Sequence, residues 1–429
     1  MKRIGPLIFL FVACLLLIRC SRKESDVLKF AIGGAPNEFD VWEELAGEFE
    51  RKTGIKVDLL HQSTDTDQRR QSLIIPLEAR RSDPDIFLMD VAWLGQFAAS
   101  DWLEPLDRHV RKGNIDVGSF FEKVVNGADR FEGQLMALPV YVDGGLLYFR
   151  EDLLSRYGYS QPPQTWGELE EIAGHVQEKQ RKTNPDFYGF VWQGAQYEGL
   201  ICNFIEYAAS NNGGIRFSED RIILDSKENL EALEFMVGLI HGSMVSPPNT
   251  FTEMKEEEAR SFFQRGKALF ERNWPYAWSL HQSEESEIRG RIGAAALPHF
   301  ESGTSVSTLG GWHVGISVFS DKKDNAAQLM KYILSYETQK KLALRLGWNP
   351  GRKDVYQDTE VLARMPHLAQ LRGVFENAVS RPNLPYYTRL SEVLQKYINA
   401  ALAGKLTPKK ALTEVEREAQ KIVERYSSP

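Results

Sequence analysis

The sequence predicts an α/β fold with a largely parallel sheet. Between Val27 and Asp90, short apolar strands alternate with segments of helical periodicity. Such alternation is typical of βαβ units, in which each helix crosses over the sheet and the strands run parallel. The chain has 429 residues, which is too many for one hydrophobic core and predicts two or three.

The first unit contains three strands and two helices. We expect strands over 27–32, 55–60 and 85–90 and a second helix over 67–80. Asn37 is expected to cap the first helix, and Gly54 to end it. Apolar residues recur there at helical spacing, at Phe39, Trp42, Leu45, Ala46 and Phe49.

The rest of the chain is expected to be mainly helical, with a few extended segments. An apolar stretch over 135–149 is broken by Gly144 and Gly145, and Thr165 with Glu168 forms a capping box. Further strands are expected at 267–271 and 307–317, and helices over 227–241, 252–264, 325–346, 361–377, 389–403 and 408–426. Because no Pro- or Ser-rich linker separates two halves, we expect lobes that exchange strands through several crossings.

The N-terminus reads as an export signal. Lys2 and Arg3 precede an apolar run over 4–18, which is typical of a secretory signal and shorter than the ~20 residues of a membrane-spanning helix. Of the three cysteines, Cys14 and Cys20 lie in this leader, which leaves Cys202 without an intramolecular partner. Cys202 is expected to be a small buried hydrophobe. A net charge of -7 without a basic block argues against nucleic-acid binding.

An aromatic cluster follows the strand expected at 267–271. Trp274, Tyr276 and Trp278 lie within five residues, and Trp312 follows Gly310 and Gly311. Sugars present apolar C–H faces that stack on aromatic rings, so the cluster suits a saccharide cleft. Core packing at the base of a loop is the alternative interpretation.

Carboxylates stand at the ends of predicted strands. Glu38, Asp90 and Asp143 lie at or just past such ends, and ligands of open α/β sheets bind at that edge. A carboxylate accepts hydrogen bonds from neighbouring hydroxyls, which is how proteins commonly hold sugars. For Glu38 the alternative is that it complements the helix dipole.

Signatures of enzymes are mostly absent. The sequence contains no GxxxxGK[ST] loop and no HExxH, and Gly303-Thr304-Ser305-Val306-Ser307 lacks the final glycine of a nucleophile elbow. The eight histidines are scattered, so no metal site is expected. A glycoside hydrolase needs only two carboxylates, which leaves that class open.

With these residues in view, the chain resembles the extracellular solute-binding proteins of family 1, and most closely its trehalose- and maltose-binding members. The segments that carry this resemblance run from Ala31 to Tyr387 and are AIGGAPNEFDVW, DTDQRR, DPDIFLMDVAWLGQFAASDWLEPLD, ALPVYVDGGLLYFREDLL, PPQTWGEL, WQGAQYEGL, SPPNTFTEM, FERNWPYAW, TLGGWHVGIS, LGWNPGRKDVY and FENAVSRPNLPYY.

The resemblance implies a type II periplasmic-binding-protein fold, in which two α/β lobes joined by three hinge crossings enclose a ligand cleft. The crossings would fall near 141–147, 309–315 and 346–351. The implied division is a lipoprotein-type signal over 1–20, a tether over 21–26, a first lobe of 27–142 plus 312–346, and a second lobe of 143–311 plus 347–429. Cys20 would be lipidated, although Arg19 departs from the small residue that normally precedes such a cysteine.

Ten ligand-binding positions follow from the resemblance. They are Glu38, Arg70 and Asp90 of the first lobe, the hinge residues Tyr141 and Asp143, the stacking wall Trp274, Tyr276 and Trp312 with the backbone of Gly311, and Arg381. The polar stretch from Thr64 to Asp67 is a further candidate.

The resemblance also implies the function. The protein would be exported and anchored to the cell membrane by its lipid, would act as a monomer without a cofactor, and would catalyse nothing. It would close its lobes over a disaccharide and deliver it to the permease subunits of an ABC importer. The alternatives are another solute on the same fold, such as a sucrose-type disaccharide, another oligosaccharide or glycerol phosphate, and an exported glycoside hydrolase. A phosphate ligand would need more cationic groups than Arg70 and Arg381.

Overall fold

The computed structural model describes residues 27–34, 36–218, 221–366, 368 and 378–427. The expected signal over 1–20, its Cys20 and the tether over 21–26 lie outside the described residues. Within the described ranges, no helix combines the length and apolarity needed to cross a membrane.

The larger sheet has six strands, and we call this sheet with its helices the first lobe. They are β1 (Leu28–Gly33), β2 (Val57–Gln62), β3 (Ile86–Asp90), β6 (Leu138–Asp143), β13 (Thr308–Ile316) and β14 (Val379–Ser380). β1 is parallel to β2 and β3, whereas β13 is antiparallel to both β3 and β6. The expectation of a largely parallel sheet therefore holds for the first three strands and for the pair of β13 and β14. It is wrong for the pairs of β13 with β3 and β6, because β13 returns from the other half of the chain.

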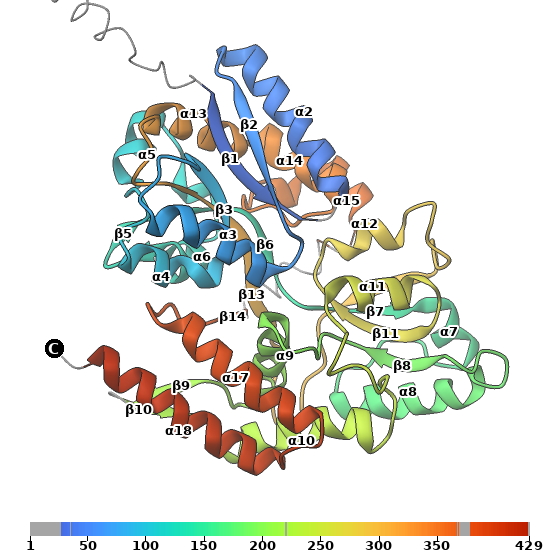
Figure 1. The fold of residues 1–429 in the computed structure, drawn as a ribbon. Coiled ribbons are helices and arrows are strands. Elements are labelled where there is room, and N and C mark those ends of the chain that lie inside the picture. The colour runs from blue at the N-terminus through green and yellow to red at the C-terminus, as the bar shows by residue number, and fades with distance from the viewer. Residues whose placement is uncertain (1–26, 35, 219–220, 367, 369–377, 428–429) are drawn as a thin grey trace, which may run out of the picture.

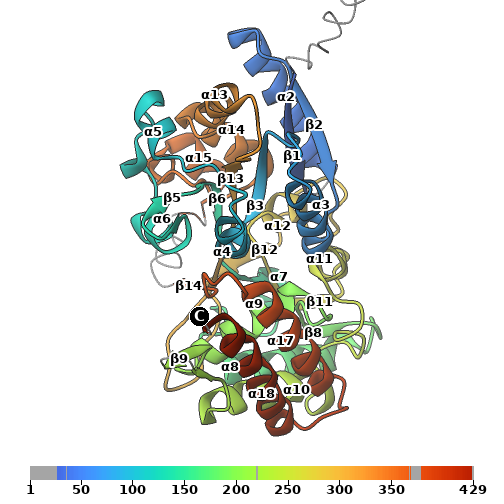
Figure 2. The ribbon, with the colours of Figure 1, turned by 60° about the vertical axis from the view of Figure 1, so that its left-hand side comes forward.

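The smaller sheet belongs to the second lobe and has the order β12-β7-β11-β8. Its strands are β7 (Leu146–Arg150), β8 (Tyr188–Val191), β11 (Ala268–Asn273) and β12 (Ile292–Ala295). β11 is parallel to β8 and antiparallel to β7. Both lobes are thus mixed α/β structures, and Figures 1 and 2 show them as two bodies, one above the other.

Helices cover both sheets. Around the first sheet lie α2 (Pro36–Thr53), α3 (Thr66–Glu78), α4 (Leu94–Ala99), α5 (Asp107–Gly113), α6 (Glu122–Ala128), α13 (Lys323–Ile333), α14 (Tyr336–Leu346) and α15 (Thr359–Arg364). Around the second lie α7 (Glu151–Arg156), α8 (Trp166–Gln180), α9 (Glu198–Ala209), α10 (Lys227–His241), α11 (Glu256–Gln264), α12 (Ala277–His281), α17 (Tyr387–Leu402) and α18 (Pro408–Ser427). Short elements complete the chain: the 3₁₀ turns η2 (Val91–Trp93), η3 (Val117–Ser119) and η4 (Val355–Gln357), and the hairpins β4 (Arg130–Phe131) with β5 (Gln134–Leu135) and β9 (Arg216–Ser218) with β10 (Arg221–Ile223).

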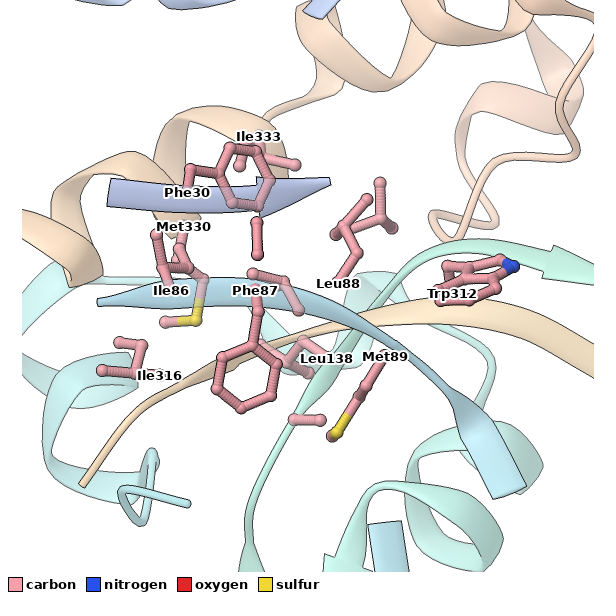
Figure 3. Packing of buried hydrophobic residues seen from close by; sticks show 14 of the residues in the cluster. Phe30, Ile86, Phe87, Leu88, Met89, Leu138, Trp312, Ile316, Met330 and Ile333 are labelled. Atoms are coloured by element: carbon pink, nitrogen blue, oxygen red, sulfur yellow. The ribbon is translucent and has the colours of Figure 1, made fainter. Parts of the chain in front are cut away.

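Each lobe has its own hydrophobic core. In the first lobe every residue of β3 is buried, because helices cover both faces of the sheet and a strand buried on both faces carries a continuous apolar run. Figure 3 shows Leu88 pointing to the side of Phe30, and Phe87 and Met89 pointing to the opposite side. A separate cluster fills the second lobe between α8, α9, α10, α17 and α18. Two large cores agree with the number expected from chain length.

The three segments expected as crossings lie together at the base of the first sheet. Gly310 pairs with Asp143 in the register of β13 and β6. The amide of Val142 donates to the carbonyl of Asn349 at 3.0 Å. Gly311 has a φ of +125°, and a Cβ there would stand 2.4 Å from the carbonyl oxygen of Tyr141, so only glycine fits. The three segments expected as crossings are thus adjacent to one another.

We propose the lobe division given above with one change. The sequence placed all of 347–429 in the second lobe, but α15 and the turn before it lie among the helices of the first lobe (Figure 2). Asp358 accepts a hydrogen bond from the hydroxyl of Tyr336 at 2.7 Å and pairs with Lys340 at 2.9 Å, and both partners belong to α14. The second lobe would then resume near α17, so the third crossing would come just before α17 and not near 346–351.

Several helix boundaries differ from the sequence predictions. The capping box of Thr165 and Glu168 is confirmed, as is the helix over 227–241. Asn37 does not cap α2, because the helix already includes Pro36. The helix expected over 325–346 is two helices, since Ser335 caps a new one. The helix expected over 252–264 begins only at Glu256, and that over 361–377 lies largely outside the described residues.

Candidate ligand-binding site

A cavity of about 290 Å³ lies between the two lobes, and we call it the main cavity. Its walls come from strand ends and helix starts of both lobes. Nine of the ten sequence-predicted positions line it: Glu38, Asp90, Tyr141, Asp143, Trp274, Tyr276, Gly311, Trp312 and Arg381. The structure thus brings together residues that are up to 343 positions apart, from Glu38 to Arg381.

Arg70 is the exception, because its neighbour Arg69 lines the main cavity instead. Successive residues of a helix point about 100° apart, and the two adjacent arginines of α3 face different spaces. Arg70 donates to Gln96 at 3.3 Å and to Glu392 at 3.4 Å on another side of α3. The RR dipeptide gave no basis for choosing between the two, because the phase of α3 depends on tertiary contacts.

Arg69 is a buried donor that faces the cavity. Its guanidinium lies 3.2 Å from the centre of the Trp312 ring, and only 3% of the residue is exposed. Within the described part of the chain, its Nε and one Nη have no hydrogen-bond partner. Burial lowers the pKa of Arg69 to about 10, against the opposing influence of Tyr141, Glu38 and Asp90. Buried polar groups are rarely left unpaired, so these donors are well placed for a ligand.

Two carboxylates stand at the strand ends, as the sequence predicted. Asp90 ends β3 and accepts from the amide of Ala92 at 2.8 Å and from Arg381 at 2.7 Å. Asp143 ends β6, and among the described residues its Oδ1 has no hydrogen-bond partner. Burial, reinforced by the charge of Asp90 and opposed by Arg272, raises the pKa of Asp143 to about 7. Asp143 is therefore the carboxylate that a donor in the cavity would satisfy.

Arg381 connects the lobes through two carboxylates. One Nη donates to Asp90 of the first lobe, and the other donates to Glu198 of α9 at 3.0 Å. Glu198 also accepts from the hydroxyl of Tyr387 at 2.7 Å and from Ser391. These bonds use two of the five N–H donors of Arg381. Among the described residues its buried Nε has no hydrogen-bond partner, so Arg381 retains a donor at the cavity wall.

Trp274 forms an aromatic wall. Its position is fixed by its amide, which donates to Asn273 at 2.8 Å, and by its carbonyl, which accepts from Tyr148 at 3.0 Å. The guanidinium of Arg272 lies 4.0 Å from the centre of the Trp274 ring. Arg272 is itself held by a bidentate pair with Glu206 and is almost fully buried. The support on one side leaves the other side of the indole for a ligand.

Sequence reasoning missed several lining residues. Trp348 lines the cavity beside Tyr141, with ring centres 4.0 Å apart, although its segment was part of the resemblance. The start of α11 contributes Lys255 and the three glutamates at 256–258. In the sequence, this charged stretch looks like an ordinary solvent-exposed helix start. Lys255 forms an ion pair with Asp65, and this pair joins the second lobe to the first at the cavity wall.

The polar stretch from Thr64 to Asp67 divides between two places. Thr64, Asp65 and Thr66 line the main cavity, whereas Asp67 lines a neighbouring pocket. Cys202 also lines the main cavity; burial raises the pKa of its thiol, which agrees with a packing role rather than a nucleophile. Among the described residues, no group of three or more His, Cys, Asp or Glu could hold a metal ion.

The arrangement is suited to a polyhydroxylated ring. An aromatic face can stack on C–H groups while carboxylates and an arginine bind hydroxyls at the rim. Acidic side chains outnumber basic ones along the wall: Arg69, Lys255 and Arg381 face eight carboxylates. A strongly anionic ligand would be repelled there.

Comparison with known proteins places the chain among binding proteins of transporters. A family model described as "Bacterial extracellular solute-binding protein" matches residues 34–340. The chain is 34% identical over 426 residues to a probable ABC transporter-binding protein of Deinococcus radiodurans. The aligned region covers 98% of this chain and 99% of that protein. It is 26% identical to a maltotriose-binding protein of Pyrococcus abyssi over 76% of this chain and 66% of that protein.

Solved structures give the same result. The maltose-bound MalE3 of T. maritima superposes with a TM-score of 0.87 at 38% identity, over 92% of this chain and 99% of that one. The acarbose-binding GacH receptor of Streptomyces glaucescens has a TM-score of 0.81 at 21% identity, over 93% and 98% of the two chains. This second likeness concerns the fold, which is the expected type II fold of two mixed α/β lobes.

Proposed function

The chain belongs to the bacterial extracellular solute-binding proteins and is the substrate-binding component of an ABC importer. From that premise we propose that it captures a disaccharide of the maltose and trehalose class. Proteins of this family bind solutes and are not catalysts, which agrees with the sequence-based expectation that the chain is not an enzyme. That finding sets aside the glycoside hydrolase.

The observation that carries the proposal is that Trp274 and polar groups without hydrogen-bond partners among the described residues line the same cavity. The indole offers a stacking face, Asp143 offers a buried acceptor, and Arg69 offers buried donors. A water occupies about 30 Å³ of the liquid, so the main cavity of about 290 Å³ has room for on the order of ten waters, which is the size of a small-molecule site. The excess of acids disfavours glycerol phosphate.

Binding would close the two lobes. Ligand held by Asp143 and Arg69 would gain its contacts to Trp274 only when the second lobe approaches, and that difference in affinity shifts the population to the closed form. The Asp65–Lys255 ion pair and the Arg381 contacts to Asp90 and Glu198 would then form or tighten across the cleft. The closed form would dock on the permease subunits.

A panel of sugars tests this function. Thermal unfolding is expected at a higher temperature with maltose, trehalose or a sucrose-type disaccharide, because a ligand that binds only the native state stabilises it. Small-angle scattering should show a smaller radius of gyration with saturating ligand. If no sugar raises the unfolding temperature while another solute does, the ligand class is wrong. An unchanged radius of gyration in the presence of a bound sugar contradicts lobe closure.

Export follows from the family, and we propose an anchor at Cys20. Replacing Cys20 with serine should block lipid attachment and release the protein from the membrane or stop its maturation, because the thiol is the acylated group. Fractionation of cells that produce each form gives the measurement. A Cys20→Ser protein that is processed and sediments with membranes as the wild type does would show that another group holds it there.

A further inference from the structure

A buried ion pair behind the main cavity joins Arg272 of β11 to Glu206 of α9. The guanidinium Nε and one Nη donate to the two carboxylate oxygens, at 2.8 Å and 2.5 Å. Each residue is 1% exposed, and neither lines the main cavity. Replacing a buried ion pair by apolar residues of similar volume is often neutral or even stabilising. Stability of the fold alone therefore does not explain why charges lie here.

The ion pair reaches the ligand site through Trp274. The guanidinium lies 4.0 Å from the centre of the indole, and a cation at the face of an aromatic ring is attracted by its π system. The other Nη of Arg272 donates to the side chain of Gln193 at 3.1 Å. That side chain in turn donates to the carbonyl of Arg272 at 2.9 Å. The guanidinium is thus held in one orientation, and the ring that packs against it is held as well.

Glu206 also binds the start of β13. The carboxylate oxygen that accepts from the Nη of Arg272 accepts from the amide of Thr308 at 3.2 Å. Thr308 is the first residue of β13, and residues 310–312 of that strand line the main cavity. Glu206 therefore fixes the Trp274 ring and a second lining segment to the same helix.

Two glycines leave the space that this arrangement needs. A Cβ at Gly145 would stand 2.6 Å from a guanidinium nitrogen of Arg272, and it would also collide with the carboxylate of Glu206. A Cβ at Gly310 would stand 3.0 Å from a ring carbon of Trp274. A larger residue at either position would displace the ion pair or the indole, because the space behind the aromatic wall is already filled.

We propose that Glu206 is a positioning residue of the ligand site. Through Arg272 it holds the Trp274 ring in the orientation that stacks on the ligand, and through Thr308 it fixes that ring relative to β13. A ring that is already oriented loses little entropy when it binds, so the ion pair increases affinity without touching the sugar. This inference rests on the proposed sugar-binding function.

An apolar replacement of the whole pair tests the proposal. Glu206→Leu combined with Arg272→Met leaves no single charge buried and should keep the fold. Calorimetry with maltose is expected to show an affinity about tenfold below that of the wild type, the scale of a lost buried cation–π contact. In a Trp274→Ala background, the same double replacement should change the maltose affinity by less than about twofold, because the pair acts through that ring.

A second arginine–carboxylate pair in the same lobe provides the control. Arg150, at the end of β7, donates to Asp152 at 2.7 Å and 2.6 Å, and neither residue lines the main cavity. Arg150→Met with Asp152→Leu should change the unfolding temperature and leave the maltose affinity unchanged. The positioning role is overturned by an unchanged affinity in the Glu206 and Arg272 variant, by an equal loss in the control, or by a tenfold loss that persists without Trp274.

The ring itself gives a measurement that needs no ligand. In protein with isotope-labelled tryptophan, the indole N–H resonance of Trp274 is the one that disappears in Trp274→Ala. We expect this resonance to broaden when Glu206 and Arg272 are replaced, because the ring then samples more than one orientation, and to stay sharp in the control. A resonance that stays sharp in both variants contradicts the proposal. A wild-type chain that binds no sugar overturns the proposed function instead, and the resonance still shows whether the pair orients the ring.

Discussion

Replacing Trp274 with alanine is expected to weaken sugar binding by about 2–4 kcal/mol, a loss of about 30- to 800-fold in affinity. The indole supplies the stacking wall of the main cavity, and its amide, carbonyl and one side are already fixed by Asn273, Tyr148 and Arg272. Such a preorganised ring costs little entropy to engage, so most of its contact energy reaches the ligand. Calorimetry with the sugar identified in the panel measures the change.

A matched control comes from the same motif. Trp278 lies four residues later and packs beside the core without lining the cavity. Trp278→Ala should therefore change the unfolding temperature and leave the sugar affinity nearly unchanged. Trp312→Ala is also expected to weaken binding, in part because Trp312 supports Arg69. Unchanged affinity in Trp274→Ala would remove that residue from the site and leave core packing as the interpretation of the cluster.

The sequence predicted most of the residues that line the main cavity, because they lie at the ends of predicted strands and in short motifs next to them. Asp90 and Asp143 end apolar strands, and the carboxyl ends of strands are where an α/β sheet exposes side chains to a ligand. Trp274 follows β11 in the same way. The family resemblance then placed residues that no local pattern could, such as Arg381.

The rest depended on tertiary structure. The choice between Arg69 and Arg70 is set by the rotation of α3 about its axis, and the buried face of that helix includes both arginines, so periodicity alone does not separate them. Lys255 and its pairing with Asp65 depend on how closely the lobes approach. The return of β13 between β3 and β6 joins residues far apart in the chain, and alternation of strands and helices carries no information about that pairing.

The charge state of Asp143 is expected to link sugar binding to pH. Its pKa is raised to about 7, chiefly by burial and further by Asp90, so much of the free protein carries a proton there near neutrality. A sugar hydroxyl that donates to Asp143 favours the ionised form and lowers its pKa in the complex. Binding therefore releases a proton, and affinity should fall as the pH drops below about 7, by up to tenfold per pH unit.

Replacing Asp143 with asparagine should reduce sugar affinity by about 2–3 kcal/mol at pH 8, or 30- to 150-fold, and should make affinity nearly independent of pH. Asparagine keeps the shape of the side chain and removes the charge that the ligand stabilises.

The unfolding temperature gives an independent check of the fold. Ionising Asp143 costs folding free energy as the pH rises from the ordinary pKa of 3.8 to about 7, because burial disfavours the charged form. The variant lacks that cost and should unfold at a higher temperature than the wild type at pH 8. Calorimetry in buffers of different ionisation enthalpy measures the released proton directly. A pH dependence that persists in Asp143→Asn would belong to another group, such as Asp67, and would remove Asp143 as the residue that couples binding to protonation.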